Sequence, residues 1–106
     1  MAPRRPSDDW PDFTETARLQ FWGLPDEAVE AFATVFPEFT RFPQRPSTSL
    51  DVCPLRNDPR RWRLKVLGYR AIYQVLHGRP IIEAVLPRSN RTYRDFEAHR
   101  RRFPPR

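Results

Sequence analysis

Residues 62–75 read WRLKVLGYRAIYQV, and this stretch predicts a β-hairpin. In its first half, apolar residues alternate with the basic residues Arg63 and Lys65, a pattern typical of a half-buried strand. Leu67-Gly68 suits a two-residue hairpin turn. The returning segment is rich in aromatic and β-branched residues, which favour strands. The stretch therefore indicates two antiparallel strands joined by a tight turn.

The turn fixes which residues face each other across the hairpin. The predicted pairs are Val66 with Tyr69, Lys65 with Arg70, Leu64 with Ala71, Arg63 with Ile72 and Trp62 with Tyr73. Because side chains alternate between the two faces of a strand, one face is apolar and packs on helices, and the other brings Arg63, Lys65 and Arg70 together. Like charges directly opposite each other cost about 0.2–1 kcal/mol, so a basic cluster without an acid indicates a phosphate site. Solvated surface charges are the alternative interpretation, and the nearby Glu83 lies on either face by alternation.

The segments before the hairpin predict a weak strand and two helices. Residues 10–13 form at most an edge strand, because Pro11 has no N–H to donate. A short helix then ends at Gly23. A second, amphipathic helix begins at Leu24-Pro25, and Pro37 is expected to kink or break it.

The segments around and after the hairpin predict further strands and a last helix. Residues 50–55 and 81–86 indicate strands that extend the hairpin to a meander of three or four strands. Residues 92–101 predict a short C-terminal helix. We expect one domain over residues 9–101, a disordered lead-in at 1–8 and a flexible tail at 102–106.

The charge of the chain is strongly polarised. The 106 residues carry a net charge of +6, but residues 1–50 hold five basic and eight acidic side chains, whereas residues 51–106 hold fourteen basic and five acidic ones. This polarity predicts a polyanionic partner for the second half. The alternative explanation is compositional, because arginine supplies all but one of the 19 basic residues and the chain has 13 prolines, as in proteins from GC-rich genomes.

Several other classes of protein are disfavoured by the sequence. No apolar run is long enough to cross a bilayer, and the N-terminus does not resemble a secretory signal, so a cytoplasmic location is expected. Cys53 is the single cysteine, which excludes an internal disulfide and indicates a small buried side chain. The two histidines have no partners at metal-ligand spacing, and the three glycines form no phosphate loop. We expect no metal and no cofactor.

A basic segment follows the last predicted strand. Arg88 can reach back over the sheet, to stabilise charge on a phosphate or protonate a leaving oxygen. Tyr93 can stack on a base or hold a proton, or it can anchor the last helix in the core. Lys65 is the single lysine of the chain. A lysine, unlike an arginine, can lose its proton when cations and burial lower its pKa, which suits a general base acting on a ribose 2′-hydroxyl.

The hairpin at 62–75 closely resembles the central hairpin of the RelE/ParE toxin superfamily, with its aromatic-basic-apolar-basic strand and Gly-Tyr-Arg turn. Residues 88–93 resemble the family's late Arg-x(n)-Tyr element. Residues 13–43 fit its pair of N-terminal helices with a Leu-Pro link and a closing proline. The resemblance covers about residues 10–100. It implies an α+β fold in which two N-terminal helices pack on a curved antiparallel β-sheet.

The resemblance also implies a function and a set of site residues. Members that cut messenger RNA have basic residues on the sheet, and this chain retains that set. Lys65 matches the likelier base of the two basic strand positions, and Arg70 matches the phosphate-holding arginine. Arg88 and Tyr93 match the late arginine and tyrosine. Further residues expected to bind RNA are Arg61, Arg63, Arg91 and Arg94, and Arg91 is an alternative to Arg88.

These matches predict a toxin of a toxin-antitoxin pair. It is expected to act as a ribosome-dependent, metal-independent endoribonuclease, in which the 2′-hydroxyl attacks the adjacent phosphate. The expected partners are a cognate antitoxin, in a hetero-oligomer, and the ribosome with its messenger RNA, with no membrane. Two alternatives stay open: a ParE-like inhibitor of DNA gyrase, and a non-catalytic relative that only binds RNA or a partner.

Overall fold

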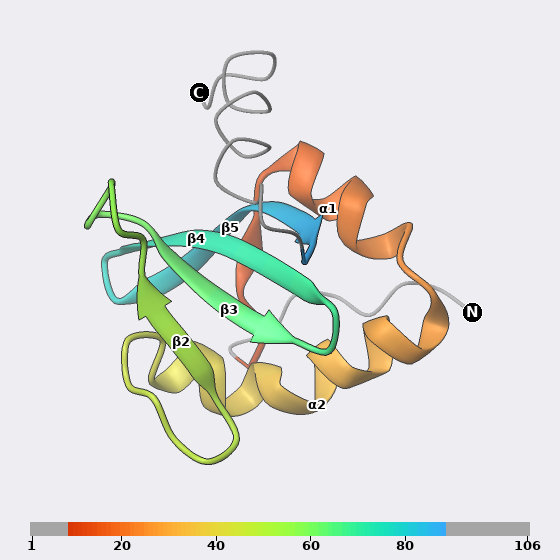
Figure 1. The fold of residues 1–106 in the computed structure, drawn as a ribbon, viewed down its shortest axis with the longest axis horizontal. Helices are drawn as coiled ribbons and strands as arrows, with labels where there is room; N and C mark the ends of the chain where they lie inside the picture. The colour runs from red at the N-terminus through yellow and green to blue at the C-terminus, as the bar shows by residue number, and fades with distance from the viewer. Residues whose placement is uncertain (1–8, 89–106) are drawn as a thin grey trace.

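The structure is a computed structural model that describes residues 9–88. The hairpin at 62–75 forms the middle of its sheet. Residues 9–88 form two helices and a five-stranded sheet, whose arrangement can be followed in Figure 1. In chain order the elements are β1 (Asp12–Phe13), α1 (Glu15–Trp22), α2 (Asp26–Arg41), β2 (Asp51–Pro54), β3 (Trp62–Val66), β4 (Tyr69–Leu76) and β5 (Arg79–Pro87). The strands lie in the order β1-β5-β4-β3-β2. The α+β fold is therefore as predicted, while the helix expected at 92–101 and both expected terminal segments lie outside the described residues.

The predicted register of the hairpin is confirmed pair by pair. Lys65 lies opposite Arg70, Arg63 opposite Ile72, and Val66 opposite Tyr69. Leu67 adopts a left-handed φ of 52° at the turn, as a two-residue turn of the primed type requires. The neighbouring strands β2 and β5 extend this antiparallel arrangement to four strands.

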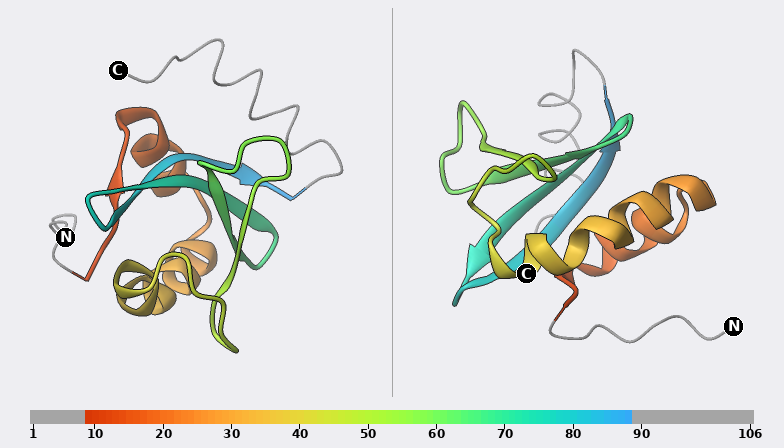
Figure 2. Two further views of the ribbon diagram at one scale, coloured as in Figure 1. Left: turned by 90° about the vertical axis from the view of Figure 1, so that its left-hand side faces the viewer. Right: turned by 90° about the horizontal axis from the view of Figure 1, so that it is seen from below.

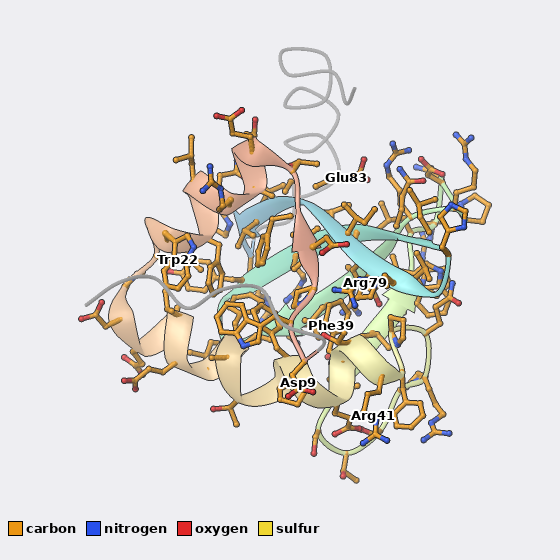
Figure 3. All side chains as sticks on the ribbon, turned by 180° about the vertical axis from the view of Figure 1, so that it is seen from behind. Asp9, Trp22, Phe39, Arg41, Arg79 and Glu83 are labelled. Carbon is orange, nitrogen blue, oxygen red and sulfur yellow. The ribbon has the colours of Figure 1, made fainter. Side chains whose placement is uncertain are left out.

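The first strand differs from the prediction of a wholly antiparallel sheet. β1 pairs in parallel with β5, so the sheet is mixed. This edge is held by Arg79, labelled in Figure 3, whose guanidinium donates to the Trp10 carbonyl at 3.0 Å and to the Asp12 carboxylate at 3.3 Å. A two-residue strand has too few side chains for periodicity to predict its direction. Its pairing depends instead on this contact, which spans 67 residues of sequence.

Both helices pack on one face of the sheet (Figure 2). Thr14 caps α1 by accepting a hydrogen bond from the Ala17 amide at 3.2 Å. Of the kink or break expected at Pro37, the break does not occur, because α2 continues to Arg41. Pro37 itself is exposed, whereas Phe36 and Phe39 on either side are fully buried against the core. Packing of these two rings therefore outweighs the hydrogen bond that the proline removes.

The core beneath the sheet is aromatic. Phe21 of α1 lies against Phe32 and Phe36 of α2, and Phe39 meets the ring of Tyr73 edge-on, with ring centres 4.8 Å apart. The Tyr73 hydroxyl donates to the Pro43 carbonyl, which joins the loop after α2 to the sheet. Burial raises the pKa of Tyr73, as expected for a phenol held neutral in an apolar surrounding. This core leaves the opposite face of the sheet to a mixture of basic residues and a smaller apolar cluster.

Candidate nucleic-acid interface

The face of the sheet away from the helices carries two neighbouring rows of side chains. Strand pairing places the first row across β2, β3, β4 and β5 as Asp51, Lys65, Arg70 and Leu86. It places the second row as Cys53, Arg63, Ile72 and Ala84. The basic residues predicted to share a face therefore do so, on four strands whose backbones are fixed by pairing.

Arg70 is the central residue of this face. Its guanidinium atom Nη1 is fully buried and has no hydrogen-bond partner among residues 9–88. Burial lowers the pKa of Arg70, and the positive charges of Arg63 and Arg88 lower it further, while Asp51 and Cys53 oppose this effect. A buried donor without an acceptor costs about 1–3 kcal/mol, more when it is charged. Arg63, Arg70 and Arg88, which we call the arginine cluster, thus form a site that an oxyanion would complete.

Arg63 differs from the expectation of an unpaired basic cluster, because it has an acidic partner. Its Nη1 donates to the Asp51 carboxylate at 3.2 Å. The side chains of Arg63 and Asp51 are 23% and 54% exposed, and a pair this exposed contributes about 0–1 kcal/mol. A phosphate can therefore replace the carboxylate at little cost.

Lys65 lies beside the arginine cluster, and Arg88 is its member at the end of β5. Lys65 is half-buried, and its Cα lies between those of Asp51 and Arg70. The Arg88 amide donates to the Gly68 carbonyl at 2.6 Å, which holds the end of β5 at the hairpin turn. The Arg88 side chain is exposed, and its charge acts on Arg70. Tyr93, Arg91 and Arg94, predicted for the same site, lie outside the described residues.

Solved structures with the same arrangement of elements come from toxin-antitoxin complexes. A chain of the RelB-RelE antitoxin-toxin complex of Methanococcus jannaschii superposes with a TM-score of 0.63 at 16% identity, over 80% of this chain and 96% of that one. A chain of the RelE-RelB complex of Pyrococcus horikoshii gives 0.62 at 20% identity, over 77% and 98%. The chain has a RelE-like fold.

A third similar chain, from the toxin-antitoxin complex RelBE2 of Mycobacterium tuberculosis, has 25% identity and a TM-score of 0.56 over 74% of this chain and 99% of that one. No protein-family model matches the sequence, and neither does any curated protein. The RelE-like fold is thus recognised by its three-dimensional arrangement at low sequence identity.

Arg61, which we expected to bind RNA, is placed elsewhere on the RelE-like fold. Only 5% of the residue is exposed. Its Nε donates to the Glu83 carboxylate at 2.8 Å, and its Nη1 donates to that of Asp58 at 2.5 Å. Burial lowers the pKa of Arg61, but hydrogen bonds and charge from Glu83 and Asp58 outweigh it, so the pKa is raised. Arg61 is thus buried in this ion network, which leaves its side chain little surface for the RNA contact expected from the sequence.

The ion network also explains Glu83, which sequence reasoning left on either face. Glu83 lies at a register shift between β4 and β5 and also accepts a hydrogen bond from Gln74 at 3.2 Å. A strand acid that is only 9% exposed needs a cation, and Arg61 directly precedes β3. The need of Glu83 for a cation could therefore have indicated its pairing with Arg61. No residue pattern indicates the bulge that turns Glu83 toward Arg61.

A small apolar cluster lies on the same face of the sheet as the arginine cluster. It consists of Leu55, Ile72 and Ala84, with Leu86 packed against them. Leu55 belongs to the loop after β2, so this loop covers part of the sheet.

Among residues 9–88, no helix is long and apolar enough to cross a membrane. No group of three His, Cys, Asp or Glu side chains in that range is placed to hold a metal ion.

Proposed function

We propose that this chain is the toxin of a toxin-antitoxin pair and that it cuts messenger RNA in the ribosome without a metal ion. The observation that carries the proposal is Arg70. Its buried Nη1, which has no hydrogen-bond partner among residues 9–88, lies on a rigid sheet in an arginine cluster with Arg63 and Arg88. The similarity to chains of RelB-RelE complexes supports the toxin assignment.

The arginine cluster is suited to the scissile phosphate. Guanidinium groups form short, charge-assisted hydrogen bonds to phosphate oxygens. A phosphate bound here would supply the acceptor that Arg70 Nη1 lacks among the described residues and would relieve the mutual repulsion of the three cations. The cluster would bind the transition state best, because negative charge on the non-bridging oxygens grows as the phosphorus becomes five-coordinate.

The reaction would be a transesterification. The ribose 2′-oxygen forms a bond to the phosphorus, and the bond from phosphorus to the 5′-oxygen breaks. Lys65 would take the 2′-hydroxyl proton. Arg88 would stabilise the negative charge on the leaving 5′-oxygen, which then takes up a proton from water. The products are a 2′,3′-cyclic phosphate and a 5′-hydroxyl. Tyr93 is assigned to base stacking or proton transfer, and Arg91 and Arg94 to RNA binding, by the resemblance alone.

An antitoxin partner follows from the same comparison. The similar chains are crystallised as RelB-RelE complexes, and we propose that this chain likewise binds an antitoxin. An acidic segment would suit a face that exposes Arg63 and Arg88. Neutralisation would then result from covering the arginine cluster.

Induced expression in bacteria tests the proposed function. We compare the wild type with a Lys65→Ala, Arg70→Ala double variant and with Arg18→Ala, which removes an exposed arginine of α1. Growth arrest with new in-frame 5′ ends of messenger RNA is expected for the wild type and for Arg18→Ala, and not for the double variant. Arrest with intact messages and filamenting cells would identify a gyrase inhibitor instead. No arrest with the wild type would contradict the toxin assignment.

A further inference from the structure

The loop between β2 and β3, residues 55–61, has a defined conformation. The Leu55 amide donates to the Arg61 carbonyl at 2.8 Å, which closes the base of the loop. The Arg61 amide donates to the Asp58 carbonyl at 2.9 Å, and the Asp58 carboxylate accepts from the Arg60 amide at 3.3 Å. These hydrogen bonds fold the loop into a turn.

Two buried side chains fasten this loop to the sheet face that carries the arginine cluster. Leu55 is 4% exposed and packs on Ile72 and Ala84. Arg61 reaches Glu83 of β5 through the ion network. Ile72 is the strand partner of Arg63, so the loop lies beside the arginine cluster. Figure 2 shows, in its right-hand view, the loop on the side of the sheet away from α2.

The outer part of the loop presents arginines to solvent. The Arg60 side chain is 80% exposed, and its guanidinium is 3.7 Å from the Asp58 carboxylate, a contact too long for a strong pair. Arg56 is exposed as well. Asp58 is engaged at 2.5 Å by the buried Arg61. Asp58 thus pairs closely with the buried Arg61 and only at longer range with Arg60, so Arg56 and Arg60 present most of their charge to solvent.

We infer that Arg56 and Arg60 form a second phosphate-contacting element, which binds the single-stranded RNA on one side of the nucleotide held by the arginine cluster. This inference rests on the proposed function. Single-stranded RNA carries a phosphate at every nucleotide, and a positively charged surface that follows its backbone binds it without reading sequence. Because the loop is already folded, little conformational entropy is lost when RNA binds.

Binding of fluorescent RNAs of two lengths tests this element. We measure anisotropy with oligonucleotides of about four and about 12 nucleotides, which bracket the site sizes of small binding domains. The Arg56→Ala, Arg60→Ala variant should bind the longer RNA about tenfold more weakly, and the dependence of its affinity on salt should fall by about 1 in slope per lost contact. Its affinity for the shorter RNA should stay unchanged.

Three matched variants make the outcome specific to the loop. Arg18→Ala, Arg41→Ala removes two exposed arginines of the helices and should bind both RNAs as the wild type does. Arg56→Lys, Arg60→Lys keeps the charge and should retain most of the affinity for the longer RNA. Arg63→Ala, Arg70→Ala should weaken binding of both lengths.

The alternative outcomes separate this inference from the proposed function. Wild-type affinity of the loop variant for the longer RNA overturns the inference and leaves the arginine cluster in place. An equal loss on both lengths also overturns it, because the loop would then act through the cluster. Wild-type binding by Arg63→Ala, Arg70→Ala contradicts the RNA site of the proposed function itself.

Discussion

The negative charge of Asp51 opposes the binding of a phosphate at the arginine cluster. Its carboxylate accepts a hydrogen bond from Arg63 at 3.2 Å, on the face where a phosphate would bind. Asp51→Asn should therefore raise the affinity for a short RNA by about twofold to fivefold, the size expected of one exposed ion pair. Anisotropy at low salt measures this change, with Glu30→Gln on α2 as a control of equal charge. Weaker binding by Asp51→Asn would show that Asp51 positions Arg63 productively.

We predict that replacing Arg70 has opposite effects on the stability of the protein and on its binding of RNA. The buried Nη1 has no acceptor among residues 9–88, so the folded protein carries the cost of a desolvated donor. Arg70→Met keeps most of the side-chain volume and removes that donor. We expect the free energy of unfolding in urea to rise by about 1 kcal/mol and RNA binding to fall. A clear loss of stability would mean that Arg70 has a structural role.

The candidate site could be predicted from the sequence only as far as strand alternation reaches. Alternation and the Leu67-Gly68 turn place Arg63, Lys65 and Arg70 on one face, and the structure does the same. The Asp51–Arg63 contact depends on how β2 aligns with β3, which no turn of fixed length specifies. The burial of Arg61, which precedes β3, depends on a bulge near Glu83, which no alternation pattern predicts.

At the level of elements, the ion network determines how the loop at 55–61 sits on the sheet. Glu83→Gln would leave the buried Arg61 with half of its compensation, because Asp58 alone would remain. Removing one partner of a buried ion pair costs about 3–5 kcal/mol when the other charge has no further partner. Because Asp58 still pairs with Arg61, the cost here should be smaller, about 1–3 kcal/mol. We expect a loss of this size in urea unfolding, whereas Glu30→Gln on an exposed surface should change it little. A loss below about 0.5 kcal/mol would show that the network is not structural.

Asp58 should make the stability of this loop depend on pH. Burial alone would raise the Asp58 pKa, but the hydrogen bond and charge of Arg61 outweigh it and hold the pKa below its ordinary 3.8. The stabilisation is therefore complete above that value and is lost as the pH falls through the lower, folded-state pKa. The stability difference between wild type and Asp58→Asn should be constant near neutral pH and shrink below about pH 4. A difference that persists in acid would contradict the pairing.

Local sequence patterns predict the order of the elements. The features that these patterns did not predict depend on contacts between residues far apart in the sequence. The two helices and the meander appear where hydrophobic period and turn residues predict them. The parallel direction of β1 depends on the contact of Arg79 with Asp12 and Trp10. The continuation of α2 through Pro37 depends on two buried rings of the core. Neither contact has a counterpart within a short window of sequence.

Across residues 9–88 taken together, the two sides of the sheet have different roles. The aromatic core and both helices occupy one side, and the first turn of α2 carries Asp26 and Glu27. The arginine cluster and the loop at 55–61 occupy the other. A polyanion would be repelled from the acidic helix end and attracted to the basic face, which orients its approach. Within residues 9–88, the acidic end of α2 and the arginine cluster thus lie on opposite sides of the sheet.

The most direct test of the proposed function is a cleavage assay on purified ribosomes that carry a defined messenger RNA. The proposed reaction predicts that the full-length wild-type chain cuts the message once it is bound in the ribosome. The upstream fragment should end in a 2′,3′-cyclic phosphate, and the Lys65→Ala, Arg70→Ala variant should leave the message whole. An intact message with the wild type, or an upstream fragment that ends in a free 3′-hydroxyl, would contradict it.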